Sequence, residues 1–474
     1  MKALPNSSGG NCTDFAKIAR GFLSHQGLPF AEILSPQRIE RVFAKHGNLF
    51  ATTGIYSTAV VIWAFLGQVL RDGKEGSCQS AVAHVIHYCL QLGRSAPTSD
   101  TGDYCKARAK LSQHAIHELS NDVAKEMEQA APKNWLWKSL HPKLIDGFTF
   151  TMPDTPENQR EYPQQKSQEL GLGQPIARVA TVLSLATACV LDAAIGPYQG
   201  KQTGENALLR TILGTFDKGD VVVADRYYCS FMMIALMLAQ GTQVCARKHQ
   251  LRHTDFRRGK RLGKNDHIIT WKKPSRPPWM DRESYEQVPP ALSLRELRYQ
   301  VVKKGRRTRT LTIITTLMDP QQYSLDDIAQ LYGFRWNVEL DIRSIKDSLN
   351  LGHVRCKSPE MVRREFWTTF LAYNLIRTTA AGAALIHDKH PRQISFTATC
   401  QYVLASWMSM ATGSIRDPQM QRYIQELLSR IVQCEVAHRA GRLEPRVVKR
   451  RPKPYKLMRK PRHILKRELR KHCG

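Results

Sequence analysis

The feature that most restricts the fold of this chain is the stretch 332–346, which divides into two stripes when it is arranged as an α-helix. At 3.6 residues per turn, the polar stripe and the apolar stripe lie about 90° apart around the helix. The apolar stripe must pack on a core, so the polar stripe then faces an edge or a cleft. The polar stripe consists of Tyr332, Arg335, Glu339, Arg343 and Lys346, and the apolar stripe of Leu331, Phe334, Val338, Ile342, Ile345 and Leu349.

This polar stripe has two interpretations. A carboxylate among cations suits a phosphodiester site, because the carboxylate can hold a divalent metal ion and the cations can hold phosphate. The same spacing of Glu before Arg and Lys is also common on a helix face that is merely solvated. The rest of the chain decides between them.

Charge indicates the kind of partner. The chain has 474 residues, enough for two to four domains of roughly 100–200 residues each. Its 42% hydrophobic content can form a sizeable core, and its formal net charge is +29. Such an excess of cations predicts a polyanionic partner, of which nucleic acid is favoured. A membrane surface or a ribosomal contact is the alternative.

Several protein classes are disfavoured. The 11 cysteines include no CxxC pair, so we expect neither a disulfide framework nor a zinc knuckle, and a reducing cytoplasm fits best. The most apolar run, Val179–Leu191, is shorter than the ~20 residues that cross a bilayer, and no signal peptide is evident. We therefore expect no membrane partner. Walker A, GxSxG and HExxH motifs are absent.

Two aspartates precede the stretch with Glu339. Asp146 interrupts the β-prone run Leu144–Phe150, where a carboxylate is costly unless it is paired or metal-bound. The alternative is an edge strand with a turn at Gly147. Asp225 ends a short buried strand, and the carboxyl end of a central strand is a usual place for a site in an α/β sheet.

We divide the chain into five segments. A helical domain, 1–138, precedes the first part of a catalytic core, 139–247. A basic, β-rich insertion, 248–318, then separates it from the second part of the core, 319–385. The segment 386–474 is a helical region that ends in a Lys/Arg/Pro tail, which is typical of chain that stays disordered until it meets an anion.

The insertion contains two tryptophans with open roles. Trp271 and Trp279 could stack on unpaired bases, but such residues more often close a small hydrophobic cluster. Two expected strands, 294–302 and 309–317, flank a basic hairpin tip at 303–307.

The order of the expected elements defines the fold class. The expected elements are, in chain order, three strands, a helix, a strand, a helix, a strand and the helix with Glu339. This order is typical of a ribonuclease H-like α/β fold with a mixed five-stranded sheet. Carboxylates from three of these elements can hold two metal ions about 3.5–4 Å apart. Oxygen ligands favour Mg²⁺ or Mn²⁺ over zinc.

These residues resemble those of a known family. Asp146-Gly147, Asp225-Arg226 and the spaced Tyr332, Arg335, Glu339 and Lys346 are similar to the DDE transposases of bacterial insertion sequences with the YREK signature, that is, insertion-sequence family four and its Tn-five and Tn-ten relatives. The resemblance covers roughly residues 140–460. It extends through 153–158, 315–317, 373–377 and 449–455.

The resemblance implies cut-and-paste DNA transposition by a nucleoid-associated bacterial enzyme. Asp146, Asp225 and Glu339 would hold two Mg²⁺ or Mn²⁺ ions, and the segment 1–138 would recognise the terminal inverted repeats. The partners would be double-stranded end and target DNA and a second copy of the chain, as a homodimer. Residues expected to contact DNA are Tyr332, Arg335, Lys346, Arg226, Arg343, Lys449, Arg450 and Arg451.

Two other functions remain open. A nuclease or resolvase on the same fold would cut DNA without joining it to a target. A DNA-binding protein that has lost catalysis would bind DNA whether or not metal is present. The three acids and the spaced YREK residues disfavour this last alternative.

Overall fold

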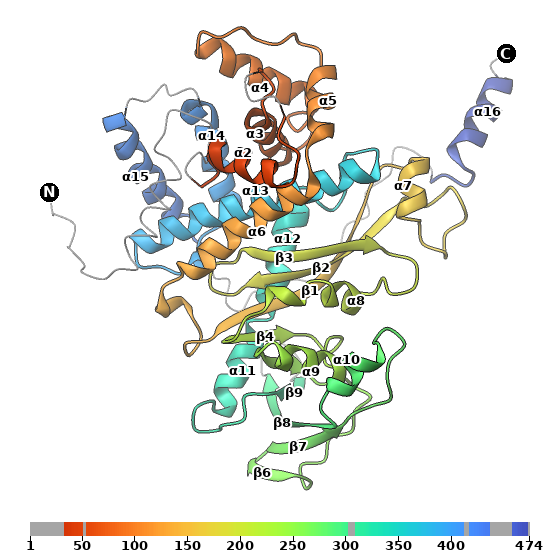
Figure 1. Cartoon of the computed structure of the whole chain (residues 1–474), viewed down its shortest axis with the longest axis vertical. Helices are drawn as coiled ribbons and strands as arrows, with labels where there is room; N and C mark the ends of the chain where they lie inside the picture. Colours follow the sequence, from red (N-terminus) through yellow and green to blue (C-terminus); the bar gives the residue numbers. More distant parts are fainter. Residues whose placement is uncertain (1–32, 51–53, 302–308, 412–416, 437–456, 473–474) are drawn as a thin grey trace.

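The computed structural model describes residues 33–50, 54–301, 309–411, 417–436 and 457–472. A large β-sheet lies beside a layer of helices from both ends of the chain (Figure 1). The expected mixed α/β class is therefore confirmed.

The first five strands follow the expected order along the chain. They are β1 (His141–Thr151), β2 (Ile176–Ser184), β3 (Val190–Pro197), β4 (Asp220–Ala224) and β5 (Gln243–Arg247). β1 is antiparallel to β2, and β2 to β3, whereas β4 lies parallel to both β1 and β5. β1 and β4 are therefore neighbours that run in the same direction.

The insertion extends this sheet. Its elements are β6 (Lys260–Gly263), β7 (Asp266–Lys272), α10 (Arg282–Gln287), β8 (Ala291–Val301) and β9 (Arg309–Thr315). β9 pairs with β5, so the strands that the structure describes form one sheet in the order β3-β2-β1-β4-β5-β9-β8-β7-β6. The five strands expected for the core are thus part of a larger sheet, because β9 of the insertion hydrogen-bonds to the edge that β5 would otherwise leave open. The basic tip, 303–307, lies outside the described residues.

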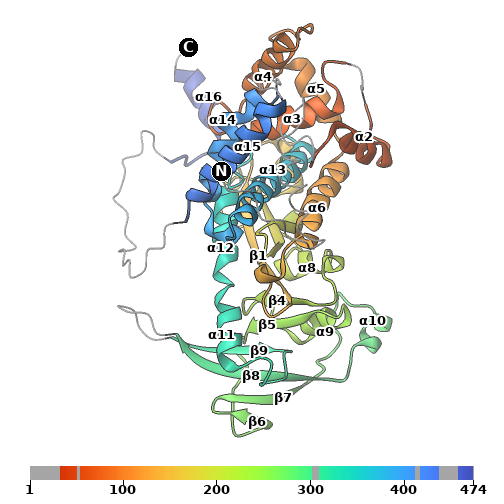
Figure 2. The same ribbon diagram turned by 90° about the vertical axis from the view of Figure 1, so that its left-hand side faces the viewer.

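Helices cover both faces of the sheet. Figure 2 shows α11 (Leu325–Gly333) and α12 (Trp336–Arg343) on one side of the strands, and α8 (Glu205–Arg210) and α9 (Phe231–Ala239) on the other. α9 is apolar almost all round and most of it is buried, which is typical of a helix inside a core.

The helical layer is organised around α13 (Pro359–Ile386), which is buried along most of its length. Asn374 of α13 accepts from the backbone N–H of Val190 at 2.8 Å and donates to the carbonyl of Ser120 at 3.1 Å. The helix thereby joins β3 to α6. The remaining helices are α2 (Pro36–Lys45), α3 (Thr58–Val69), α4 (Cys78–Gln91), α5 (Gly102–Lys110), α6 (Gln113–Gln129), η1 (Lys133–Trp135), α7 (Pro156–Glu161), η2 (Leu213–Thr215), η3 (Ser344–Ser348), η4 (Pro391–Gln393), α14 (Phe396–Ala411), α15 (Asp417–Gln433) and α16 (Arg462–His472).

The stretch 332–346 is not one continuous α-helix as expected. α11 ends at Gly333, α12 begins at Trp336, and Lys346 lies in the π-helical turn η3. The N–H of Arg335 donates to the carbonyl of Tyr332, so the connection tightens to an i to i+3 bond. Phe334 and Arg335 keep right-handed helical angles, so the two helices continue in one direction.

The C-terminal tail differs from its expectation in part. Residues 462–472 form the helix α16, although the composition is typical of a disordered tail. Lys449, Arg450 and Arg451 lie outside the described residues. Within the described ranges, no helix combines the length and apolarity that a membrane span requires.

Candidate active site

Asp146 lies in the middle of β1 on the face that α12 covers. Its Oδ2 atom lies 3.8 Å from the Arg335 guanidinium, and its Oδ1 atom accepts from the N–H of Gly147 at 2.8 Å. Alternation along a strand puts Phe148 on the same face. The Lys346 ammonium lies 5.9 Å from the centroid of the Phe148 ring. β1 therefore presents Asp146 to Arg335 and Lys346.

Asp225 follows the last residue of β4. Because β4 runs parallel to β1 with Val223 opposite Leu144, both aspartates lie toward the same edge of the sheet. The Asp225 Oδ1 atom accepts from the N–H of Tyr227 at 2.7 Å, which fixes the turn after the strand.

Glu339 reaches this edge from α12. Its Oε1 atom lies 2.5 Å from Arg335 Nη2, while Arg335 Nη1 faces Asp146. One guanidinium thus lies between a carboxylate from a strand and a carboxylate from a helix. The structure brings Asp146, Glu339 and Arg335 into contact, with Asp225 close enough for its charge to act on Asp146.

Burial is the main cause that raises the pKa of Asp146 to about 6. The negative charges of Asp225 and Glu205 raise it further. The N–H of Gly147 and the Arg335 guanidinium oppose the increase. A carboxyl group with a raised pKa beside other carboxylates is typical of a functional site.

This pKa predicts a pH-dependent effect of Asp146→Asn on stability. The native carboxyl binds its proton more tightly than the unfolded one, so wild-type stability falls as pH rises from about 4 to about 6. Asp146→Asn lacks this decline in stability. As pH rises through this window, the free energy of unfolding of the variant should therefore increase relative to that of the wild type, by no more than roughly 3 kcal/mol. Urea unfolding of both proteins at pH 4.5 and pH 7.5 in metal-free buffer measures the difference. An equal difference at both pH values would contradict the prediction.

The donor set suits a hard divalent cation. Carboxylate oxygens are ligands that Mg²⁺ and Mn²⁺ prefer. Across the part of the chain that the structure describes, no three His, Cys, Asp or Glu side chains are close enough together to hold a metal as they stand. Arg335 instead supplies the positive charge between Asp146 and Glu339. Asp146 and Glu339 are therefore arranged around one cationic side chain.

A fourth carboxylate was missed by the sequence analysis. Glu205 begins α8, and its Oε2 atom accepts from the Tyr228 hydroxyl at 3.2 Å. Burial raises its pKa, and the charge of Asp225 adds to the increase. A single Glu after a glycine carries no distinctive sequence signal, so only the fold could reveal it.

The expected phosphate-binding residues differ in exposure. Arg226 and Arg343 are exposed, and Arg335 and Lys346 are partly exposed. Arg226 donates to the side chain of Gln250 at 2.5 Å. Tyr332 is buried, and burial raises its pKa to about 12.

The two tryptophans are already in contact with arginines. Trp271 is buried, and the Arg252 guanidinium lies 3.7 Å from its ring centroid, which favours the packing interpretation over base stacking. The Arg210 guanidinium lies 3.9 Å from the ring of the partly buried Trp279. The exposed aromatic rings nearest in sequence to the site residues are instead Tyr227 and Trp336.

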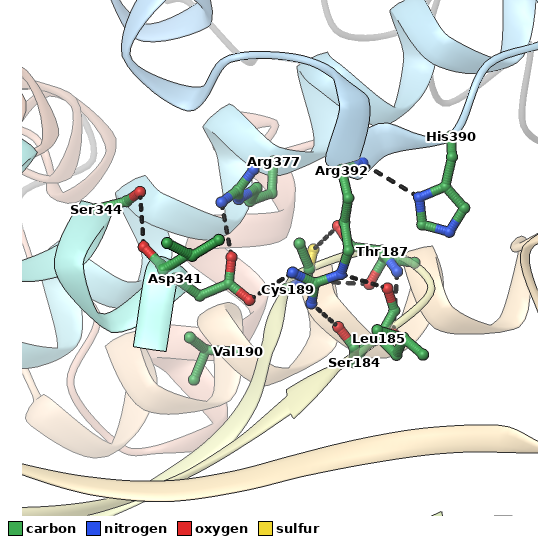
Figure 3. Close-up of polar contacts among 12 residues, drawn as sticks. Ser184, Leu185, Thr187, Cys189, Val190, Asp341, Ser344, Arg377, His390 and Arg392 are labelled. Carbon is green, nitrogen blue, oxygen red and sulfur yellow. Dashed lines mark hydrogen bonds and ion pairs between the residues drawn. The ribbon is translucent and has the colours of Figure 1, made fainter. Parts of the chain in front are cut away.

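A buried ion-pair network anchors the helix that carries Glu339. Asp341 lies between two arginines, Arg377 Nη2 at 2.9 Å and Arg392 Nη1 at 2.8 Å (Figure 3). Arg392 also donates to the carbonyls of Ser184 and Leu185 at 2.7 and 2.6 Å. The network joins α12 to α13, to η4 and to the turn between β2 and β3, which fixes the position of Glu339 two residues away.

Comparisons with known proteins match the part of the chain that contains these residues. Residues 142–375 match the family described as the transposase DDE domain. The chain is 25% identical over 436 residues to the transposase InsG for insertion sequence element IS4 of Escherichia coli (strain K12), covering 90% of this chain and 92% of that protein. It is 30% identical over 81 residues to the transposase for insertion sequence element IS421 of Escherichia coli, covering 16% of this chain and 22% of that protein.

One solved structure shows a weak overall likeness. It is a cryo-EM structure of the piggyBac transposase synaptic complex with hairpin DNA, with a TM-score of 0.42 and 10% identity over 88% of this chain and 85% of that chain. A likeness at that level carries no argument about this site.

Acids on a mixed α/β sheet, within a matched transposase domain, define a DDE-type DNA transposase. The matched transposase DDE domain, together with the likeness to InsG over nearly the whole chain, identifies this chain as a DDE transposase similar to that of IS4. The family expected from the spaced Tyr332, Arg335, Glu339 and Lys346 is thereby confirmed.

Proposed function

We propose that this transposase binds the terminal inverted repeats of an insertion sequence, cuts there by metal-dependent hydrolysis and joins the freed end to target DNA. The observation that carries the proposal is the position of Arg335 between Asp146 and Glu339. That geometry brings a phosphate-binding cation and two carboxylates from separate elements to one edge of the sheet, with Asp225 on the neighbouring strand.

The strand order supports a ribonuclease H-like core as the framework for this chemistry. The spatial order β3-β2-β1-β4-β5, antiparallel at β3 and β2 and parallel at β4 and β5, places the five strands expected from the sequence in one mixed sheet. The segments 139–247 and 319–385 would form this core, with 248–318 as an insertion. Residues 1–138 would bind end DNA, and 386–474 would complete the helical layer.

The residues of the site divide into two roles. Asp146, Asp225 and Glu339 would hold two Mg²⁺ or Mn²⁺ ions, which supply Lewis acidity at the attacking and leaving oxygens. Arg335 and Lys346 would orient the scissile phosphate for in-line attack. Water attacks phosphorus first and the 3′-oxygen leaves; in the joining step, the freed 3′-hydroxyl attacks a target phosphate and displaces a second 3′-oxygen.

Contact with phosphate would draw Arg335 away from the acids. A guanidinium pairs with phosphate in the same bidentate manner as with carboxylate. End binding would therefore free the Asp146 and Glu339 oxygens for the metal ions.

A labelled fragment that carries one end of the element and its flanking DNA tests this function. Metal-dependent cutting at one defined end, followed by joining to a second DNA, is the expected result. Cutting without joining would indicate a nuclease or resolvase. Salt-sensitive binding that is the same in Mg²⁺ and in EDTA, without any cutting, would indicate a DNA-binding protein that has lost catalysis.

Lys346→Ala should weaken end binding and reduce its salt dependence. If Lys346 contacts one phosphate, its loss should reduce the slope of log K against log salt by roughly one unit. Fluorescence anisotropy across a salt series measures the slope. Lys218→Ala is the matched control, because Lys218 is exposed just before β4, at the edge opposite Asp225. Binding with an unchanged slope would refute the phosphate contact.

Joining two ends to one target requires two active sites, so we expect a homodimer on paired end DNA. Size-exclusion chromatography with light scattering on end DNA should give two chains and two ends. A complex of one chain with one end under cutting conditions would count against it.

A further inference from the structure

A second glutamate, besides Glu339, lies near the edge of the sheet that carries Asp146 and Asp225. It lies on the opposite face of the sheet from Glu339. Ile145 and Gly147 alternate with Asp146 along β1 and so face the opposite layer, where Ile145 and Met233 of α9 line the same small cavity. Figure 2 places α8 in that layer and α12 across the strands from it. Glu205 at the start of α8 and Glu339 in α12 therefore approach β1 from opposite faces.

Gly147 is what allows Glu205 to approach this closely. A Cβ atom on Gly147 would lie 2.2 Å from Glu205 Cδ and 2.6 Å from Glu205 Oε1. Both distances are far below van der Waals contact. The carboxylate of Glu205 thus occupies the space of the missing side chain, beside the backbone of Asp146.

Two hydrogen bonds fix α8 to the turn after β4. Glu205 accepts from the buried Tyr228 hydroxyl, and the Asn206 side chain donates to the carbonyl of Tyr227 at 3.0 Å. Tyr227 and Tyr228 follow Asp225 directly after Arg226. The position of Glu205 is therefore set by the same turn that sets Asp225.

Glu205 has no ion pair in the described ranges, although the charge of Arg178 acts on it from β2. It is partly buried, yet none of the basic side chains in the described ranges forms an ion pair with it. A neutral tyrosine hydroxyl does not balance a carboxylate charge, and a partly buried charge is costly unless it is paired or bound to metal. Asp225 likewise has no ion pair within those ranges.

We propose that Glu205 is a fourth carboxylate of the active site and binds the divalent metal ion on the side of Asp225, opposite Glu339. This assignment rests on the proposed function, because it requires the metal site at Asp146 and Asp225. Tyr228 is then a positioning residue, because it acts through its hydrogen bond to Glu205. Glycine at position 147 is required so that Glu205 can reach the site.

Metal affinity of the full-length chain, measured alone and bound to an uncut end fragment, tests the proposal without depending on activity. Mn²⁺ is titrated into wild type, Glu205→Gln, Glu339→Gln and Glu283→Gln, and binding is followed by calorimetry and by the electron paramagnetic resonance signal of free Mn²⁺. Glu283 is an exposed glutamate of α10 and serves as the matched control. Glu205→Gln should weaken Mn²⁺ binding at least about tenfold, whereas Glu283→Gln should leave it unchanged.

Two further variants separate a metal ligand from a structural residue. Gly147→Ala keeps Glu205 but places a methyl group where its carboxylate lies, so it should weaken Mn²⁺ binding comparably. Tyr228→Phe should weaken it less, because the ligand remains. The unfolding temperature of each metal-free variant should be close to that of the wild type, which shows that the fold is intact.

The outcomes distinguish this proposal from the proposed function. Wild-type Mn²⁺ affinity in Glu205→Gln, together with weak binding in Glu339→Gln, would overturn the role of Glu205 and leave the active site as proposed. Absence of Mn²⁺ binding by the wild type, both alone and on end DNA, would overturn both.

Discussion

Glu339→Gln is expected to abolish DNA cutting while DNA binding remains. The amide keeps the size of the side chain but cannot supply an anionic oxygen. Loss of this ligand should lower the cutting rate by about three orders of magnitude, or roughly 4 kcal/mol of transition-state stabilisation. Single-turnover cutting of a labelled end in Mg²⁺ measures the rate, and a mobility shift in EDTA measures binding.

The control for this result is Asp347→Asn. Asp347 is an exposed acid in η3, in the same stretch of chain, and the change also removes one negative charge. It should cut at close to the wild-type rate. Cutting by Glu339→Gln within tenfold of wild type would refute the assignment of Glu339 as a metal ligand.

Asp341→Ala is expected to be the most destabilising single substitution near the site. Asp341 is almost fully buried and balances both Arg377 and Arg392. Its removal leaves two largely buried guanidinium groups without a counter-charge, which should cost about 3–5 kcal/mol. The variant should therefore unfold at a clearly lower urea concentration, followed by circular dichroism.

An exposed ion pair provides the comparison for Asp341. Glu426 pairs with Arg430 on the surface of α15, so Glu426→Ala should change stability by less than about 1 kcal/mol. Asp341→Ala should also cut slowly at temperatures where it is folded, since α12 loses its attachment to α13 and η4. A change in stability as small as that of Glu426→Ala would contradict the anchoring role.

Local patterns account for what could be predicted from the sequence. Asp146 and Asp225 were identifiable because a carboxylate in or directly after a buried apolar run is costly without a partner. Glu339 was identifiable because its spacing to Tyr332, Arg335 and Lys346 gives one helical stripe. Their placement in one chain was enough to indicate the family.

Long-range pairing accounts for what was missed. The extension of the sheet by β9 depends on an edge of β5 that no local pattern marks. No local pattern marks the break of the Glu339 helix at Gly333 or the π turn at Lys346, where α12 packs on β1 and Lys346 lies near Phe148 of that strand. Glu205 became visible only when α8 was placed over Gly147.

The sequence by itself predicted a polyanionic partner and the three candidate acids and determined the transposase family, because charge, apolar runs and spacing are local properties of the chain. Only the tertiary structure decided that Arg335 lies between Asp146 and Glu339, that Asp341 anchors their helix, and that Glu205 approaches from the opposite face. The physical reason is that each of these contacts joins elements far apart in the sequence, and side-chain distances between such elements are set by the packing of helices on the sheet.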